Sequence, residues 1–247
     1  MNNTSLWRAL GRNTIISIIL FGALLGLLWC VEWSVAFFQL STFNFQLLRW
    51  SDPAWVVGIP ASIIGVAYIL TIRDPQNYTG FYAGIVMSAL LGVQFILQQQ
   101  YDSAVLYYAV FIPFQILSIV NWRKPKPASD APFVPEYLSS GQRSVTLLIT
   151  ALIIAADYLL CTYVFQHDAL TDHMAVKFFN GLLIASSVFA NYWLIYRKID
   201  AWFYWVAYSI AGIALFIIIG NIFSIVLFTF FLVINGAAGI AWIRLRR

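Results

Sequence analysis

Amide and hydroxyl side chains recur at helical spacing inside the apolar segments of this chain of 247 residues. In FFNGLLIASSVFANYW (178–193), Asn180 and Asn191 are about three helical turns apart, and Ser187 shares their face of the helix. An amide in hydrocarbon costs free energy unless it is hydrogen-bonded. We therefore expect this face to bind a polar ligand or a neighbouring helix.

A second apolar segment repeats the arrangement, with Gln115, Ser118 and Trp122 at positions i, i+3 and i+7 of FIPFQILSIVNW (111–122). The further polar or aromatic candidates in apolar segments are Ser88, Gln94, Gln98, Asn235, Trp242 and Trp193. Together these side chains can line one cavity, in which Trp193 offers a face for a planar ring. Asn, Gln and Ser also join membrane helices to one another, at roughly 0.6 to 2 kcal/mol each. Helix association therefore stays open for any single amide.

Only two acidic residues, Glu32 and Asp157, fall inside apolar segments. For Glu32, which lies between Trp29 and Trp33, we expect snorkelling to the interface or a helix contact. Asp157 is either a proton-coupling site or a hydrogen-bond partner of a neighbouring helix, and the second role is favoured. Lys177 is expected to reach the lipid headgroups.

The sequence lacks the motifs of several enzyme classes. His167 and His173 fall in one short segment between apolar runs, which excludes a histidine-based metal or catalytic site within those runs. The chain contains no GxSxG, HExxH or phosphate-binding glycine loop, and we find no Arg or Lys clamp for a phosphate or carboxylate. We expect a protein that is not an enzyme and that needs no cofactor or metal. The remaining amides, hydroxyls and rings suit an uncharged or weakly cationic solute such as a nucleoside.

The composition is typical of a polytopic membrane protein, because 62% of the residues are hydrophobic, 10% are charged and the mean hydropathy is +0.81. The basic residues behind the net charge of +4 are scattered, which favours a lipid bilayer over nucleic acid as the partner. Cys30 and Cys161 lie in apolar runs, and we expect no disulfide or metal site between them. Apolar runs of membrane-spanning length predict eight helices, at about 14–40, 55–72, 78–100, 104–122, 143–165, 174–196, 201–218 and 221–243.

The loop charges predict an orientation. With eight spans, both termini face the same side of the membrane. The segments on that side contain twelve Arg and Lys residues, whereas the opposite side contains only Arg49 and Lys177. The positive-inside rule then places both termini in the cytoplasm.

Two apolar segments are similar at an offset of 120 residues. FIPFQILSIVNW (111–122) and FLVINGAAGIAW (231–242) both begin with Phe, carry an amide at the fifth position and end with Trp. Chance similarity between lipid-facing segments stays an alternative. We predict an all-α integral membrane protein with two parallel three-helix bundles joined by a linker helix (3+1+3), plus one extra N-terminal helix. The predicted single membrane domain, 1–247, consists of the extra helix 14–40, bundle 55–122, linker helix 143–165 and bundle 174–243.

Several segments carry a resemblance to a known family: WSDPAW (50–55), QQQYDSAVLYY (98–108) followed by FQILSIVNWRK (114–124), FFNG (178–181), and FLVINGAAGIAWIRLRR (231–247). Over about residues 55–247 the chain resembles the bacterial PnuC-type transporters of nicotinamide riboside, the vitamin B3 nucleoside. Members of that family are similar in fold to the sugar-transporting SWEET proteins, with two three-helix bundles and a linker helix. The resemblance implies an inner-membrane protein that moves nicotinamide riboside by facilitated diffusion and alternating access. A cytoplasmic kinase then traps the riboside by phosphorylation.

The resemblance also extends to single residues. Gln115 matches the family's glutamine in the fourth helix, and Asn180 matches its asparagine in the sixth, although Gly181 stands where the family usually has Trp. A nicotinamide carboxamide has a donor and an acceptor that an amide can match, and its pyridinium ring can lie against aromatic faces. The expected substrate-binding residues are Gln115, Asn180, Asn191, Ser187, Gln94, Ser118, Asn235, Trp122 and Trp193.

Two other functions stay open. One is a proton-coupled carrier of another nucleoside or vitamin, with Asp157 as the proton site. The other is a non-transporting membrane scaffold, in which the amides only join helices. The oligomeric state also stays open, a homo-oligomer included.

Overall fold

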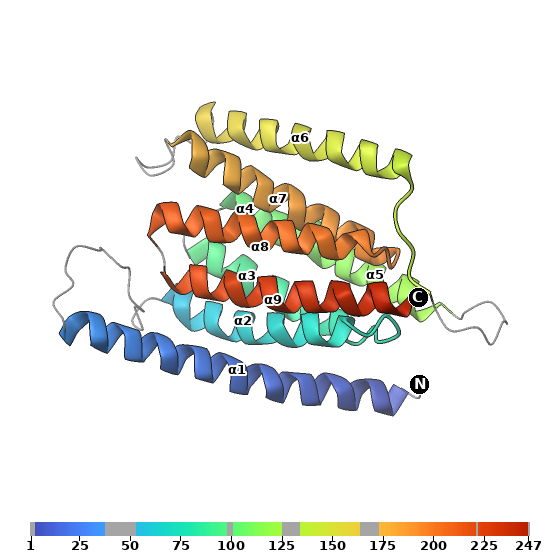
Figure 1. The fold of residues 1–247 in the computed structure, drawn as a ribbon, viewed down its shortest axis with the longest axis horizontal. Coiled ribbons are helices and arrows are strands. Elements are labelled where there is room, and N and C mark those ends of the chain that lie inside the picture. The colour runs from blue at the N-terminus through green and yellow to red at the C-terminus, as the bar shows by residue number, and fades with distance from the viewer. Residues whose placement is uncertain are drawn as a thin grey trace. The chain divides into compact units, whose positions relative to one another are not determined.

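Backbone N–H and C=O groups in a bilayer must be satisfied within their own segment, which favours helices for apolar runs of this length. The computed structural model of the chain describes residues 3–37, 53–97, 101–124, 134–163, 173–220 and 222–246. Outside this described part lie Arg49, Gln98 and His167, and the side chains of Cys30 and Glu32. The elements in chain order (Figure 1) are α1 (Asn3–Phe37), α2 (Pro53–Ile72), α3 (Gly80–Leu97), α4 (Tyr101–Leu106), η1 (Tyr107–Phe111), α5 (Ile112–Arg123), α6 (Ser140–Tyr163), α7 (Met174–Ile195), α8 (Asp200–Ile219) and α9 (Ile222–Leu245).

Within the described part, seven helices are long and apolar enough to cross a membrane: Thr4–Gly26, Gly80–Leu97, Ser103–Arg123, Ser140–Tyr163, Met174–Ile195, Asp200–Ile219 and Ser224–Leu245. The apolar stretch of α2, Val56–Ile72, is shorter. The helix bounds agree with the predicted spans to within three residues, except that α1 begins at Asn3 instead of residue 14. The polar turns before the first apolar run contain no proline, so the helix extends through them.

The chain divides into two compact units, Met1–Val134 and Pro135–Arg247, and each is described by itself. The helix predicted as a linker, α6, belongs to the second unit in this division. Whether the two units form the single membrane domain predicted from the sequence is not tested by this division.

Small residues let the helices of the first unit approach closely, as is usual where membrane helices associate. α3 packs against α2 on one side and against η1 and α5 on the other. A Cβ atom at Gly84 of α3 would lie 2.7 Å from Oε1 of Gln115, and one at Gly92 would lie 2.6 Å from the ring of Tyr108. Both glycines therefore determine how near α3 comes to the following helix.

The extra N-terminal helix α1 packs on α2. Its buried side chains include Leu6, Asn13 and Phe21, which recur at spacings of seven or eight residues along one face. Asn13 Nδ2 donates a hydrogen bond of 3.0 Å to Oγ1 of Thr71 on α2. A polar contact and an apolar stripe together hold α1 on the first unit.

A π-helical turn interrupts the helix that runs from Tyr101 to Arg123. The N–H of Ile112 donates to the carbonyl of Tyr107, five residues earlier. Pro113 follows directly, lacks an N–H group and crowds the preceding turn. The π turn η1 accommodates this proline just before the segment that carries Gln115.

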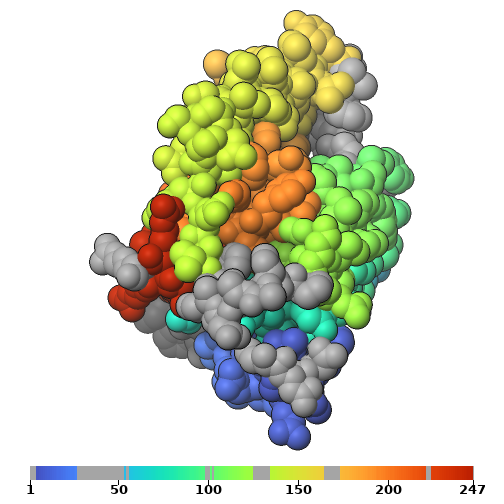
Figure 2. All heavy atoms as spheres, turned by 90° about the vertical axis from the view of Figure 1, so that its right-hand side faces the viewer, coloured from blue at the N-terminus to red at the C-terminus, as the bar shows by residue number. Residues whose placement is uncertain are grey.

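In the second unit, α7 packs against α6 and α8, and α8 packs against α9. A Cβ atom at Gly181 of α7 would lie 3.0 Å from the Cα of Ile154 on α6, and Gly212 of α8 lies directly under the ring of Phe228 on α9. α6, yellow-green to yellow in Figure 2, has exposed apolar side chains such as Leu148 and Leu152. We expect lipid to cover this face of α6.

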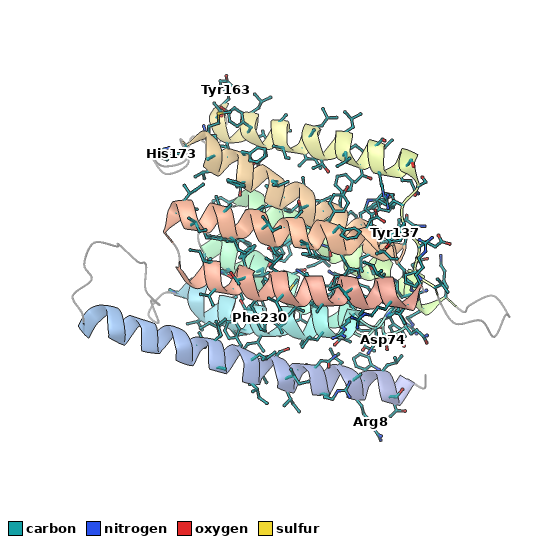
Figure 3. All side chains as sticks on the ribbon, viewed as in Figure 1. Arg8, Asp74, Tyr137, Tyr163, His173 and Phe230 are labelled. Carbon is teal, nitrogen blue, oxygen red and sulfur yellow. The ribbon has the colours of Figure 1, made fainter. Side chains whose placement is uncertain are left out.

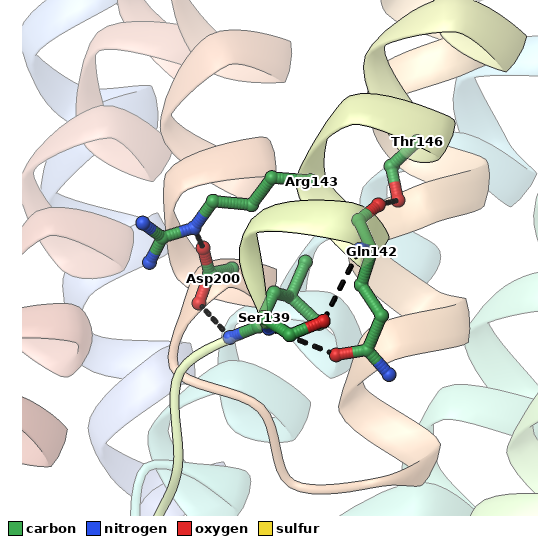
Figure 4. Close-up of polar contacts among 6 residues, drawn as sticks. Ser139, Gln142, Arg143, Thr146 and Asp200 are labelled. Atoms are coloured by element: carbon green, nitrogen blue, oxygen red, sulfur yellow. Dashed lines mark hydrogen bonds and ion pairs between the residues drawn. The ribbon is translucent and has the colours of Figure 1, made fainter.

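The segment that leads into α6 is held by the turn between α7 and α8. Nε of Arg143 lies 2.8 Å from Oδ1 of Asp200, and Oδ2 of Asp200 accepts a hydrogen bond of 2.9 Å from the N–H of Leu138 (Figure 4). Tyr137 lies in this segment and is labelled in Figure 3. The guanidinium groups of Arg143 and Arg246 lie 5.6 and 4.7 Å from the centroid of its ring. Asp200 thus ties the start of α6 to the start of α8.

Candidate functional site

The glutamine predicted to bind substrate lies in the interior of the first unit. Gln115 on α5 is 2% exposed, and its Nε2 donates a hydrogen bond of 3.3 Å to the hydroxyl of Tyr68 on α2. Gly84 of α3 leaves the space that the Gln115 amide occupies. Three helices therefore meet at one neutral amide.

Further buried aromatic rings and hydroxyls lie on the same helices as this amide. The rings of Phe81 and Trp122 meet edge to face, with centroids 4.7 Å apart and an interplanar angle of 87°. Ser118, predicted on the same face of α5 as Gln115, is buried, and so is Ser88 of α3. Oγ of Ser88 has no hydrogen-bond partner among the described residues. We call Tyr68, Phe81, Ser88, Gln115, Ser118 and Trp122 the first amide layer.

Gln94, which was also predicted to bind substrate, lies outside the first amide layer. Its side chain is half-buried and lies against Gly58 of α2, where a Cβ atom would come within 2.8 Å of Gln94 Oε1. Gln94 of α3 therefore meets α2 at Gly58, whereas Gln115 of α5 meets α2 at Tyr68.

The second unit contains a comparable arrangement between α8 and α9. Asn235 on α9 is 1% exposed, and its Nδ2 donates to Oγ of Ser209 at 3.2 Å and to the carbonyl of Trp205 at 3.4 Å. The rings of Trp202 and Trp242 meet edge to face, with centroids 5.5 Å apart and an interplanar angle of 74°. We call Trp202, Trp205, Ser209, Asn235 and Trp242 the second amide layer.

Four residues of the first amide layer have a counterpart in the second at a nearly constant offset along the chain. Trp122 and Trp242 are 120 residues apart, as are Gln115 and Asn235, whereas Phe81 and Trp202 are 121 residues apart. Ser88 and Ser209 also match at 121 residues, and both are fully buried. Sequence reasoning missed Ser209 and Trp205. Applying the repeat offset to the third span would have indicated Ser209.

Asn180 faces the helix α6 in the second unit. Its Nδ2 donates a hydrogen bond of 3.2 Å to Oδ2 of Asp157, and the missing side chain at Gly181 lets the two helices approach. The prediction that Asp157 bonds to a neighbouring helix is thereby confirmed. The described contacts of Asn180 are thus with α6, and its role toward substrate stays a prediction.

Lys177 is also turned toward α6. It is 7% exposed, its Nζ donates to Oγ1 of Thr162 at 3.1 Å, and it lies 5.6 Å from the ring centroid of Tyr158. The prediction that Lys177 reaches the headgroups is wrong, because a neighbouring helix offers this ammonium group a hydroxyl and an aromatic face.

The remaining residues of the predicted α7 stripe are buried and bond to their own helix. Asn191 Nδ2 donates to the carbonyl of Ser187 at 2.9 Å, and Oγ of Ser187 donates to the carbonyl of Ile184 at 2.8 Å. Trp193 packs against Tyr192, and its Nε1 is buried with no hydrogen-bond partner among the described residues. In the described part of the chain, no three His, Cys, Asp or Glu side chains are grouped in a way that could hold a metal ion.

Comparison with known families decides what class of protein these helices form. The model of the family described as "Nicotinamide mononucleotide transporter" matches residues 55–244, a range that contains both amide layers. The chain belongs to the nicotinamide mononucleotide transporter family. This membership confirms the resemblance to PnuC-type proteins. With seven apolar helices in the described part of the chain, this member of the nicotinamide mononucleotide transporter family is an integral membrane protein, and its function class is membrane transport.

The fold of this nicotinamide mononucleotide transporter family member is similar to a solved structure. The structure titled "Crystal structure of the Vitamin B3 transporter PnuC" matches with a TM-score of 0.65 and 14% sequence identity, over 99% of this chain and 98% of that chain. At this identity the match shows the fold. No curated protein matches the chain in sequence.

Proposed function

We propose that the chain carries nicotinamide riboside across the membrane by facilitated diffusion. The observation that supports this function best is the pair of neutral amide layers, each with a buried amide and an edge-to-face aromatic pair on the same helices. A buried amide offers both a donor and an acceptor, and a nicotinamide carboxamide and ribose hydroxyls offer the same. An aromatic face suits the delocalised pyridinium charge.

The chemistry of the layers favours the riboside over its phosphorylated form. A phosphate group needs Arg or Lys ligands or converging N–H donors. The residues that form the two layers are all neutral. Phosphorylation by a cytoplasmic kinase would then trap the substrate, because the charged product cannot return through neutral layers.

We further propose the 3+1+3 arrangement with both termini in the cytoplasm of a bacterial inner membrane. The matched aromatic pairs and amides at offsets of 120 and 121 residues support two equivalent three-helix bundles, α2–α3–α5 and α7–α8–α9, with α6 as the linker. The charge distribution supports the orientation. Alternating access follows from rocking of one bundle against the other.

The substrate-binding residues in this proposal are those expected from the sequence. Gln115, Ser118 and Trp122 come from the first layer, and Asn235 comes from the second. Gln94, Asn180, Ser187, Asn191 and Trp193 are retained as substrate-binding candidates.

Uptake into liposomes tests the function. We expect purified protein to admit labelled nicotinamide riboside, with no ion gradient, until the internal and external concentrations are equal. Gln115→Ala should weaken binding about tenfold, for the loss of about 1.4 kcal/mol, whereas the exposed Gln76→Ala serves as the matched amide control.

Each outcome has a defined meaning. Absence of uptake by folded wild-type protein would reject the transport of nicotinamide riboside. It would favour a non-transporting membrane scaffold, in which the amides only join helices. Preference for the mononucleotide over the riboside would reject the argument from neutral layers. Equal binding by Gln115→Ala and Gln76→Ala would remove Gln115 from the site.

A further inference from the structure

Basic side chains gather where three segments of the second unit meet, at one end of its helices. The segments are 134–143, 197–200 and 244–246. Together they contain five Arg or Lys residues and two acidic residues. Both acidic side chains are paired, Asp200 with Arg143 and Glu136 with Lys198. The charge of Arg246 also acts on Glu136, more weakly than Lys198 does. This end of the second unit therefore has an excess of positive charge.

Two of these basic residues lie at the ends of apolar helices. Arg143 is in the first turn of the apolar helix Ser140–Tyr163, and Arg246 directly follows the apolar helix Ser224–Leu245. The side chain of Arg143 is 49% exposed, and Arg246 is exposed as well. The end of a membrane-spanning helix lies near the lipid headgroups, and a long arginine side chain there can extend to them. Both guanidinium groups are thus placed at the depth of the lipid phosphates.

The two guanidinium groups converge on one aromatic ring. They lie 5.6 and 4.7 Å from the ring centroid of Tyr137, one from the start of α6 and the other from the end of α9. A cation held against the face of a ring keeps its N–H groups for other partners. Arg143 uses its Nε for Asp200, and its two terminal nitrogens point away from Asp200 in Figure 4. Tyr137 therefore holds two groups of N–H donors close together.

We propose that Arg143 and Arg246, held in place by Tyr137, bind the phosphate of an anionic phospholipid. A guanidinium group can donate two parallel hydrogen bonds to a phosphate. Excess positive charge at the membrane surface attracts an anionic headgroup, whereas a choline headgroup brings a cation of its own. The site requires that the chain lies in a membrane, and it does not rest on the proposed transport of nicotinamide riboside.

Native mass spectrometry of the full chain in neutral detergent tests the site, with phosphatidylglycerol and phosphatidylcholine of the same acyl chains as probes. We expect wild-type protein to bind phosphatidylglycerol more tightly. Arg246→Gln should weaken this binding about fivefold, which corresponds to the roughly 1 kcal/mol that one arginine contributes near an anionic surface. Arg143 is left unchanged, because it also bonds to Asp200.

Arg244→Gln is the matched control. Arg244 is exposed, and it lies two residues before Arg246 and so on another face of α9. The variant removes the same charge at the same end of the helix. We expect it to keep the wild-type affinity for phosphatidylglycerol. An equal loss of affinity in the two variants would overturn the proposal, because the lipid would then respond only to net charge.

Two variants of Tyr137 test the convergence without a change of charge. Tyr137→Leu removes the ring that holds the two guanidinium groups, and we expect it to weaken phosphatidylglycerol binding about two- to fivefold. Tyr137→Phe keeps the ring face and should keep the affinity. Unchanged binding in a folded Tyr137→Leu variant would overturn the role of the ring.

Glycerol 3-phosphate separates a lipid from a soluble phosphate as the ligand. It carries a phosphate without acyl chains, and we expect it to leave phosphatidylglycerol bound when both are present at equal concentration. If glycerol 3-phosphate displaces the lipid under these conditions, the site is one for soluble phosphates and the proposal fails. Equal binding of phosphatidylglycerol and phosphatidylcholine by wild-type protein would also reject it.

Discussion

At the scale of single residues, each buried amide is matched to the residue on the facing helix. Gln115 has room because position 84 is glycine, and a Cβ atom there would lie 2.7 Å from its Oε1. Asn235 is shorter, and it bonds to the backbone carbonyl of Trp205 and to the hydroxyl of Ser209. The side-chain volume at position 84 of α3 thus limits which amide the next helix can present.

Gly84→Ala tests this match. The added methyl group should push the Gln115 amide or α3 itself out of place, and overpacking of this kind costs about 1–3 kcal/mol. We expect a lower Tm in detergent and weaker riboside binding by calorimetry.

Gly141→Ala on α6 is the control for helix propensity, because Gly141 is exposed and a Cβ atom there meets nothing within 4 Å. It should leave the Tm unchanged or raise it slightly, since Ala is favoured over Gly in helices by about 1 kcal/mol. If Gly84→Ala and Gly141→Ala change the Tm equally, Gly84 does not determine how closely the helices pack.

At the scale of elements, two ion pairs of unequal burial hold the segment before α6. Asp200 is 6% exposed and is bonded to both Arg143 and the N–H of Leu138. Glu136 lies 2.7 Å from Lys198, but its side chain is 74% exposed. The hydrogen bond from Lys198 and its positive charge lower the pKa of Glu136 below its ordinary value.

Asp200→Ala and Glu136→Gln should therefore differ in cost. Loss of Asp200 leaves the buried N–H of Leu138 without its acceptor, and we expect a loss of about 1–3 kcal/mol in unfolding free energy. Glu136→Gln should cost less than about 1 kcal/mol, since water screens an exposed pair. Denaturant titration in mild detergent measures both.

The contribution of Glu136 to the unfolding free energy should depend on pH in one direction. A lowered folded-state pKa makes Glu136 stabilising above its unfolded-state pKa, and this contribution disappears as the pH falls through the folded-state value. The difference between wild-type protein and Glu136→Gln should thus be present at neutral pH and absent in acid. A difference that grows in acid would contradict the Lys198 pairing.

At the scale of the whole molecule, the question is whether transport needs a proton. Asp157 is 8% exposed in a membrane-spanning helix, and it accepts a hydrogen bond from Asn180. That bond gives Asp157 a structural role between α6 and α7. Facilitated diffusion requires nothing more of it.

Asp157→Asn keeps an oxygen that can accept from Asn180 and removes the titratable group. We expect it to retain riboside uptake into liposomes, with no dependence on an imposed pH gradient. Asp157→Leu, which loses the acceptor, should lower the Tm. Gradient-driven accumulation in wild-type protein that vanishes in a folded Asp157→Asn variant would establish the proton-coupled carrier instead.

The helices, the family and the repeat were within reach of the sequence. A run of apolar residues has the length of a bilayer crossing whatever surrounds it, so helix bounds from α2 onward agreed to within three residues. The amide and Trp that recur after 120 residues also indicated Gln115 and Asn235, and both are buried.

Only the tertiary structure decided which group each polar side chain meets. Asn180 was predicted to face a cavity, and its described bond is to Asp157. Lys177 was predicted to reach the headgroups, and it bonds to Thr162. Helical spacing shows that residues share a face, but the partner of that face depends on the helix that packs there and on how closely it approaches. A small residue such as Gly181, which faces the backbone of Ile154, decides that approach.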